Sequence, residues 1–471
     1  MGQNSKMKKK LTEYIQPLVE KFEDVRIARK VKDVVSKMVA NQTTRLWTIS
    51  TDEREFERMR DLFNGRLKSV LDNEKISAAL REEMATELGN SEVVYALHDP
   101  CDIRKRYSEK LENLGIVRDL EGKLIHGYSS FNTVCVSSDG KKTQLSDITV
   151  FSNGDDEYYV RQKELDDLEK KQKKAAKSNT EADLSKREKA IVELLETDEV
   201  INLQQVTRTQ VQRVSQRLKE ENENLQVCHV LDRQFDGLSY FQFIEDDLHD
   251  FFVIRMKISR NSNETTVNED EKEVAVKLKD VTMPNTHREV LDKVILGNKV
   301  YQQVKRIIAW GTITLEGKAY AVVRVTLFTR KGKEIFPQPM LLITNYTITN
   351  NQQAVGIYRI YLQRAKIEGV FKFVKNTLGW EDLQVRDWES IKNIIALAFF
   401  IGGYFYEIEP ELAHNPGMEW LCALGGGKGI ISRHFFLEGL KNLLIQQQVE
   451  RFREKTRLKP ADWPDVLELA L

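Results

Sequence analysis

The sequence predicts a mixed α/β protein of the α+β type, in which a β-rich middle is flanked by helical regions. Apolar residues recur at intervals of three and four through the first 75 residues and again after residue 346, as in amphipathic helices. Between residues 93 and 345, short apolar runs and alternating polar and apolar residues indicate strands. The chain has 471 residues, 41% hydrophobic and 31% charged. It is therefore long enough for about two to four domains with a substantial core.

Residues 1–75 are expected to form an N-terminal helical domain. Although the whole chain has no net charge, residues 1–70 hold 16 Lys and Arg against 10 Asp and Glu. A local excess of positive charge favours contact with phosphates. Five basic residues are expected to line this surface: Arg26, Arg29, Lys30, Arg66 and Lys68. On charge alone, an ordinary solvated helix face is the better interpretation, and the motifs described below favour an N-terminal helical DNA-binding domain.

Residues 76–258 are expected to form the first part of the core. The short apolar run VVYALHD ends in Asp99, and two further strands are predicted in HGYSSFNTVCVSSDG and TQLSDITVFSN, joined by a turn at Asp139-Gly140. This pattern resembles the opening strands of an RNase H-like core. Residues 155–225 interrupt it with a charged segment that we expect to be helical or partly mobile.

The core pattern then returns and leads into a β-rich insertion. The stretch LQVCHVLDRQFDGLSYF predicts a strand that ends at Asp232, followed by Arg233 as a DNA-contact candidate. The stretch DFFVIRMKI predicts the next strand. Residues 259–345 alternate polar and apolar residues, which predicts antiparallel strands. Turns are expected at Glu316-Gly317 and Lys331-Gly332.

The stretch YLQRAKIEGVFKFVK predicts a single amphipathic helix. Spacings of three, four and seven place four residues on one face: Tyr361, Arg364, Glu368 and Lys375. The opposite face is apolar: Ile367, Val370, Phe371, Val374 and Leu378. Residues 346–400 are therefore assigned to the second part of the core. Residues 401–471 are assigned to a C-terminal helical region that is a candidate for dimerisation.

The spacing Y-x2-R-x3-E-x6-K resembles the YREK signature of the bacterial DDE transposases of the insertion-sequence-four family. That family also carries a β-rich insertion between its second acid and its signature helix, where this chain has residues 259–345. The resemblance implies an RNase H-like catalytic core with a β-rich insertion. It also implies an enzyme that cuts and joins DNA.

Three carboxylates on separate elements are expected to act as catalytic groups and metal ligands: Asp99, Asp232 and Glu368. Two divalent ions about 4 Å apart activate the attacking oxygen and stabilise the leaving oxygen of a phosphodiester. Mg²⁺ suits such a carboxylate site, with Mn²⁺ as an alternative. Asp102 stays open as the first acid, because Cys101 stands where the family has a small hydroxylated residue.

The resemblance also implies a set of DNA contacts. Arg364 and Lys375 would bind phosphates at the end of the element, and Tyr361 would add a hydroxyl group. The family passes through a hairpin intermediate in which an aromatic side chain stacks on a flipped base. Met340 stands at the matching place here instead of Trp. Either Met340 supports the base, or Trp310 substitutes for it, or the hairpin step differs.

The leading interpretation is a cut-and-paste DNA transposase. Its expected partners are double-stranded DNA, as terminal inverted repeats and as target, and a second copy of the chain in a synaptic complex. The first alternative is a metal-dependent nuclease of the same fold that cuts without joining. The second is a domesticated DNA-binding protein or an inhibitor of transposition.

Other classes find little support in the sequence. The four cysteines have no paired spacing, and the histidines form no zinc pattern. The first residues lead into no apolar signal region, and the longest apolar run, IIALAFFIGGYF, is shorter than a bilayer-spanning helix. We therefore expect a cytoplasmic bacterial protein associated with the nucleoid and not with a membrane.

Overall fold

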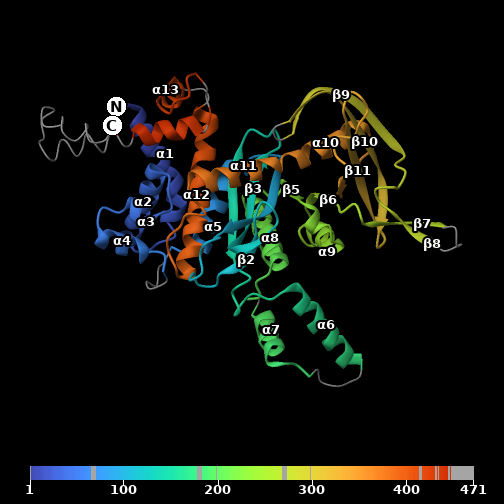
Figure 1. The fold of residues 1–471 in the computed structure, drawn as a ribbon, viewed down its shortest axis with the longest axis horizontal. Helices are drawn as coiled ribbons and strands as arrows, with labels where there is room; N and C mark the ends of the chain where they lie inside the picture. The colour runs from blue at the N-terminus through green and yellow to red at the C-terminus, as the bar shows by residue number, and fades with distance from the viewer. Residues whose placement is uncertain are drawn as a thin grey trace, which may run out of the picture. The chain divides into compact units, whose positions relative to one another are not determined.

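The computed structural model describes residues 2–64, 71–177, 183–197, 199–267, 273–296, 299–412, 416–429, 432, 434–443 and 446. Its internal contacts divide the chain into two units. The described parts of residues 1–72, 374–385 and 389–471 form a helical unit, and those of residues 73–373 and 386–388 form a unit built around a sheet. Figure 1 shows the elements coloured along the chain.

The helical unit combines helices from both ends of the sequence. They are α1 (Gly2–Val19), α2 (Val25–Asn41), α3 (Leu46–Ile49), α4 (Glu53–Arg60), α12 (Trp388–Leu412) and α13 (Pro416–Leu424). Asp24 caps α2 by accepting the backbone N–H of Arg26. The Tyr14 hydroxyl donates to the carbonyl oxygen of Phe400 at 2.7 Å, which ties α1 to α12.

Helix α12 contains the apolar run IIALAFFIGGYF and buries most of it. The helix spans 25 residues. Within the described residues, Trp388–Ile408 is the one segment long and apolar enough to cross a membrane. However, 89% of that segment is buried inside the protein. Its composition is thus explained by burial, because a helix that is apolar on all sides is typical of a protein core.

In the described part of the chain, the second unit is built around a mixed sheet of ten strands. Its first six strands are β1 (Val93–Arg104), β2 (Gly115–Arg118), β3 (Leu124–Ser137), β4 (Thr143–Phe151), β5 (Gln226–Leu231) and β6 (Phe251–Arg255). Strands β4, β3 and β1 pair antiparallel, whereas β1, β5 and β6 pair parallel. Helices α5 (Asn73–Leu88) and α8 (Leu203–Glu221) pack on this part of the sheet. The predicted α+β, RNase H-like fold class with helical flanks is confirmed.

The strands of the insertion continue the same sheet. They are β7 (Asn261–Val267), β8 (Glu273–Lys277), β9 (Asn285–Leu296), β10 (Lys299–Leu315), β11 (Lys318–Phe328) and β12 (Met340–Thr344). Strand β12 pairs with β6, and β11, β10 and β9 follow in order, whereas β7 and β8 form a separate pair. The turn between β10 and β11 has positive φ angles at Glu316 (47°) and Gly317 (85°), as expected from the sequence.

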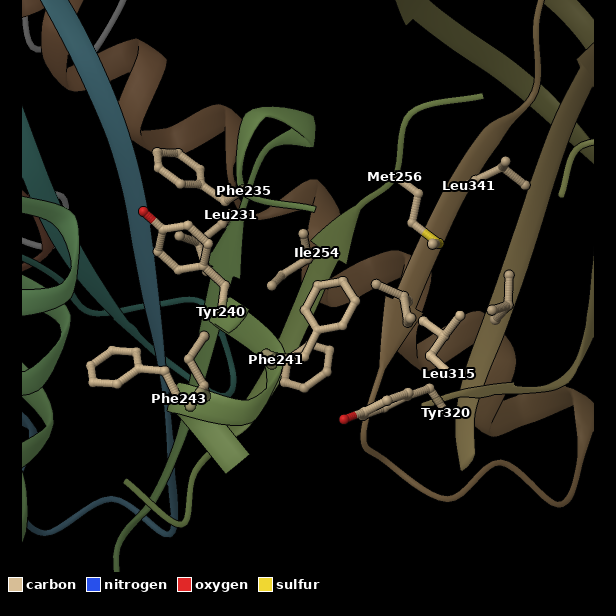
Figure 2. Packing of buried hydrophobic residues seen from close by; sticks show 14 of the residues in the cluster. Leu231, Phe235, Tyr240, Phe241, Phe243, Ile254, Met256, Leu315, Tyr320 and Leu341 are labelled. Carbon is tan, nitrogen blue, oxygen red and sulfur yellow. The ribbon is translucent and has the colours of Figure 1, made fainter. Parts of the chain in front are cut away.

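A hydrophobic cluster joins the insertion to the core strands (Figure 2). The core contributes residues from β5, β6, the short helix α9 (Leu238–Gln242) and the π-helical turn η2 (Phe243–Asp247). The ring of Phe241 stacks on Phe252 with centroids 5.2 Å apart and meets Tyr320 of β11 edge-on at 5.7 Å. A fully buried aromatic side chain contributes about 2–3 kcal/mol through the hydrophobic effect. The cluster therefore holds the insertion firmly to the core.

The charged segment predicted for residues 155–225 consists of two different parts. Helices α6 (Gln162–Lys177) and α7 (Lys186–Glu196) lie side by side and share a small core of their own (Figure 1). Helix α8 is the second part, and it packs on the sheet instead of on α6 and α7. It buries Val211, Val214 and Leu218 against the sheet unit, because its apolar residues recur at helical spacing beneath the charges.

The predicted single helix over residues 361–375 is interrupted, which corrects the sequence expectation. Helix α10 (Asn351–Leu362) ends after Tyr361, and α11 (Ala365–Thr377) begins after Arg364. In the intervening turn, backbone N–H groups bond to carbonyl oxygens three residues earlier: Gln363, Arg364, Lys366 and Ile367. The winding is tighter in this turn than in the two α-helices. Arg364 still contacts Glu368 four residues later, and both Tyr361 and Arg364 reach Asp232.

Candidate active site

Asp99 lies within strand β1. The apolar run that ends in Asp99 had instead predicted that the strand ends there. Strand β1 continues to Arg104 and stays paired with β3 along its whole length. Its pairing with β5, however, ends at Leu97. Pro100 is accommodated because this half of β1 has one neighbouring strand, so that a missing N–H is tolerated.

Asp232 directly follows β5, as predicted. The register of β1 and β5 is constant from Val93 opposite Gln226 to Leu97 opposite Val230. Continued by two residues, the same register places Asp99 level with Asp232. Neighbouring strands are about 4.8 Å apart, so the two carboxylates emerge close together.

Arg364 connects all three predicted acids. One terminal nitrogen, Nη2, lies 3.1 and 3.0 Å from the two carboxylate oxygens of Asp99 and 3.9 Å from Oδ2 of Asp232. The other, Nη1, donates to Oε1 of Glu368 at 2.6 Å. The break between α10 and α11 places Arg364 in the turn, from which its side chain reaches acids on three elements. The structure thus brings Asp99, Asp232 and Glu368 together around one guanidinium group.

Two further side chains contact Asp232. The hydroxyl of Tyr361, a residue only 5% exposed, donates to Oδ1 of Asp232 at 3.2 Å. Arg255, the last residue of β6, lies 3.9 Å from the same oxygen. Sequence reasoning missed Arg255. The available signal was a charged residue at the end of the apolar run in DFFVIRMKI, on a strand next to the one that ends at Asp232.

Asp102, the alternative first acid, lies elsewhere. Alternate residues of a strand point to opposite faces, so Asp99 and Asp102 project from opposite sides of the sheet. Oδ2 of Asp102 accepts the backbone N–H of Arg118 at 3.1 Å, and Oδ1 accepts the Ser129 hydroxyl at 3.5 Å. The geometry therefore favours Asp99 as the partner of Asp232.

The electrostatics of the cluster favour a bound cation. Burial raises the pKa of Asp99 to about 6; Arg364 opposes this rise, whereas Asp232 and Glu368 add to it. Three carboxylates face the two guanidinium groups of Arg364 and Arg255, which leaves one formal negative charge uncompensated. Carboxylate oxygens are the ligands that Mg²⁺ prefers, so the donor set fits a divalent ion.

The position of Arg364 sets a condition for metal binding. Among the residues that the structure describes, no three Asp, Glu, His or Cys side chains stand close enough to hold a metal ion as they are. The guanidinium group occupies the space between the acids, and its buried Nε has no hydrogen-bond partner. Closing the acids around an ion requires the guanidinium to move from the centre.

We predict that Mn²⁺ affinity decreases about tenfold per pH unit below pH 6, because a protonated Asp99 cannot act as a ligand. The raised pKa also means that, without metal, Asp99 stabilises the fold at low pH and loses this contribution as pH rises through about 6. Electron paramagnetic resonance of free Mn²⁺ between pH 5 and 8 measures the affinity. A constant affinity over this range would contradict the role given to Asp99.

The other predicted DNA contacts are dispersed over the chain. Lys375 belongs to the helical unit and forms an ion pair with Glu381 at 3.2 Å. Arg233 is exposed beside Asp232, and Met340 is partly buried at the start of β12. Trp310 is only 9% exposed, and its indole N–H donates to Asn351 at 3.0 Å, so a base can stack on it only if the ring leaves this position.

The predicted contacts near the N-terminus are partly described. Arg26, Arg29 and Lys30 are exposed on α2, opposite the buried residues of that helix. Arg26 is already paired with Asp24 at 2.9 Å. Arg66 and Lys68 lie outside the described residues. The exposed basic face of α2 is therefore the part of the predicted surface that lies within the described residues.

Residues 211–401 match the family model described as Transposase DDE domain. This range of the chain is therefore similar to a transposase DDE domain. The matched range runs from α8 into α12 and contains Asp232, Arg364 and Glu368, whereas Asp99 lies before it. The assignment of Asp99 thus rests on the geometry. A comparison with curated proteins found no match.

Proposed function

We propose that the chain is a cut-and-paste transposase of the insertion-sequence-four type, with Asp99, Asp232 and Glu368 as its catalytic acids. The observation that carries this proposal is the convergence of three carboxylates from β1, β5 and α11 on Arg364. The Transposase DDE domain match and the YREK spacing support it from the sequence.

In this proposal the acids hold divalent cations, Mg²⁺ or Mn²⁺, between two adjacent strands and one helix. Such ions activate the attacking oxygen and stabilise the leaving oxygen of the phosphodiester. Asp99 supplies its oxygens from β1, and Asp232 supplies them from the residue that directly follows β5. Glu368 is 59% exposed at its side chain and closes the site from the helix.

Arg364 and Tyr361 have supporting roles in the proposal. Arg364 stabilises the acids before DNA binds and then contacts a phosphate, for which its planar, two-pronged donor set is suited. Tyr361 orients Asp232 through its hydroxyl group. Arg233 and Lys375 add charge for the DNA backbone, and we propose a homodimer that holds two element ends.

The decisive experiment uses labelled DNA that carries the repeats flanking the gene for this chain. With Mg²⁺, we expect cleavage at the repeat ends followed by joined products. Cleavage without joining would favour the nuclease alternative, and binding without cleavage would favour the domesticated protein or inhibitor. A hairpin at the cut end would support base flipping with Met340 or Trp310, and open ends would show that this step differs.

The exposed face of α2 gives a separate prediction. Replacing Arg29 and Lys30 together by Gln should weaken DNA binding and reduce the slope of log K against log salt by about two, since each phosphate contact contributes about 0.9. Arg26→Gln is the matched control on the same helix, and it should change the slope less because Asp24 already pairs with Arg26. An unchanged slope in the double variant would contradict a phosphate role for α2.

A further inference from the structure

A series of hydrogen-bonded polar side chains runs from strand to strand on the face of the sheet opposite the proposed acids. His98 is the neighbour of Asp99 and points to the opposite face of β1, toward α8. His229 lies on β5, three residues before Asp232. Both histidine side chains are completely buried. Buried polar groups are costly unless they are hydrogen-bonded, so this arrangement requires an explanation.

The hydrogen bonds in this series have a fixed order of donors and acceptors. His229 Nε2 lies 3.1 Å from Oδ2 of Asp250, and a carboxylate only accepts, so this nitrogen carries the proton. In the neutral ring Nδ1 of His229 is then an acceptor, and it lies 2.9 Å from His98 Nε2. His98 Nε2 must donate, which leaves its Nδ1 to accept the hydroxyl of Thr133 at 2.8 Å.

The same order continues on both sides of the histidines. Gln210 of α8 donates to the Thr133 hydroxyl at 2.8 Å, and Thr149 of β4 donates to the Gln210 carbonyl oxygen at 2.9 Å. At the other end, Asp250 accepts the Ser215 hydroxyl and forms an ion pair with Lys219 at 2.6 Å. Each ring nitrogen therefore has one partner when both histidines are neutral.

The location of the two rings gives them a mechanical role. The backbone pairing of β1 with β5 ends at Leu97 opposite Val230. Asp99 and Asp232 lie two residues beyond this last pair, where no backbone bond fixes the distance between the strands. The bond between His98 and His229 links the two strands on the face behind the acids. Two apolar side chains would fill the same space, but they would lack the directional hydrogen bond that fixes the position of one strand relative to the other.

We propose that His98 and His229 are positioning residues, which hold β1 and β5 at the separation that Asp99 and Asp232 need. This inference rests on the proposed function, because it assumes that these two acids hold the metal. A shift of about 1 Å in a reacting group reduces a rate about a hundredfold. Groups behind metal ligands typically affect metal affinity by about 10-fold to 100-fold.

The test compares His98→Leu with His98→Gln, because the Gln amide keeps a donor near the position of Nε2. We expect His98→Leu to reduce kcat about a hundredfold and Mn²⁺ affinity about tenfold, with KM for DNA unchanged. His98→Gln should retain most of the wild-type kcat and most of the wild-type Mn²⁺ affinity. Val214→Ala is the matched control, since it removes buried volume from α8 at a residue that makes none of these side-chain hydrogen bonds, and it should keep kcat.

Nitrogen-15 NMR of the wild-type protein supplies a measurement that does not depend on activity or on folding of the Leu variant. Both rings should be neutral and protonated at Nε2. Protonation of either ring at Nδ1 instead would overturn the hydrogen-bond order. Wild-type kcat and Mn²⁺ affinity in His98→Leu, or an equal loss in Val214→Ala, would overturn the positioning role alone. A wild-type chain that neither binds Mn²⁺ nor cleaves DNA would overturn the proposed function together with it.

Discussion

Asp99→Asn should abolish DNA cleavage, whereas Asp102→Asn should leave it near the wild-type rate. A metal ligand at a two-ion site contributes several kcal/mol to the transition state. At 1.36 kcal/mol per factor of ten, a loss of about 4 kcal/mol corresponds to a decrease of about a thousandfold. Asp102 projects from the other face and accepts hydrogen bonds from Arg118 and Ser129. Single-turnover cleavage of labelled DNA measures both variants.

This pair of variants is closely matched, because the two positions share one strand and one chemical change. DNA binding should be retained in both, which a gel-shift assay verifies. Asp232→Asn and Glu368→Gln should behave like Asp99→Asn. If Asp102→Asn were the inactive variant, the first acid would have been assigned to the wrong face of β1.

The second large effect is expected for Arg364→Gln in the absence of metal. Removing one partner from a buried ion pair typically costs about 3–5 kcal/mol, since the remaining charge is left uncompensated. Here the variant leaves Asp99 and Glu368 without their guanidinium partner. We expect the free energy of unfolding at pH 8 to decrease by about 3 kcal/mol in EDTA. Millimolar Mg²⁺ should restore much of this loss, because a cation takes the place of the guanidinium.

Arg81→Gln is the matched control for this experiment. Arg81 forms an ion pair of similar burial with Asp147, at 2.8 Å. Its removal should destabilise the fold comparably, with no recovery on addition of Mg²⁺. Urea titrations of the wild type and of both variants, with EDTA and with Mg²⁺, measure the free energies of unfolding. Equal recovery in both variants would indicate general stabilisation by the ion and would contradict a specific site at Arg364.

Much of the fold could be predicted from the sequence because strands and helices differ in their apolar periodicity. The hairpin at Asp139-Gly140 and the turn at Glu316-Gly317 were marked by residues that tolerate positive φ angles. The end of β5 at Asp232 was marked by the change from apolar to charged residues. Local patterns of this kind are sufficient where local chemistry determines the conformation.

Other features could not be predicted because they depend on distant partners. No glycine or proline marks the break between α10 and α11. The break coincides with the contacts of Arg364 to three acids, which are distant in sequence or on the next helix. The apolar run VVYALHD suggested that the strand ends at Asp99, although pairing with β3 continues to Arg104. His98 and His229 are 131 residues apart, and neither has a local spacing that identifies a partner.

The pairing of β12 with β6 has a consequence for engineering and for the evolution of this fold. Strand β12 is the last strand of the insertion and covers one side of β6. A deletion that removed the whole insertion would leave β6 with unpaired backbone groups, and exposed strand edges promote aggregation. Shortened versions of this protein should therefore retain β12 and shorten the sheet from its outer strand, β9.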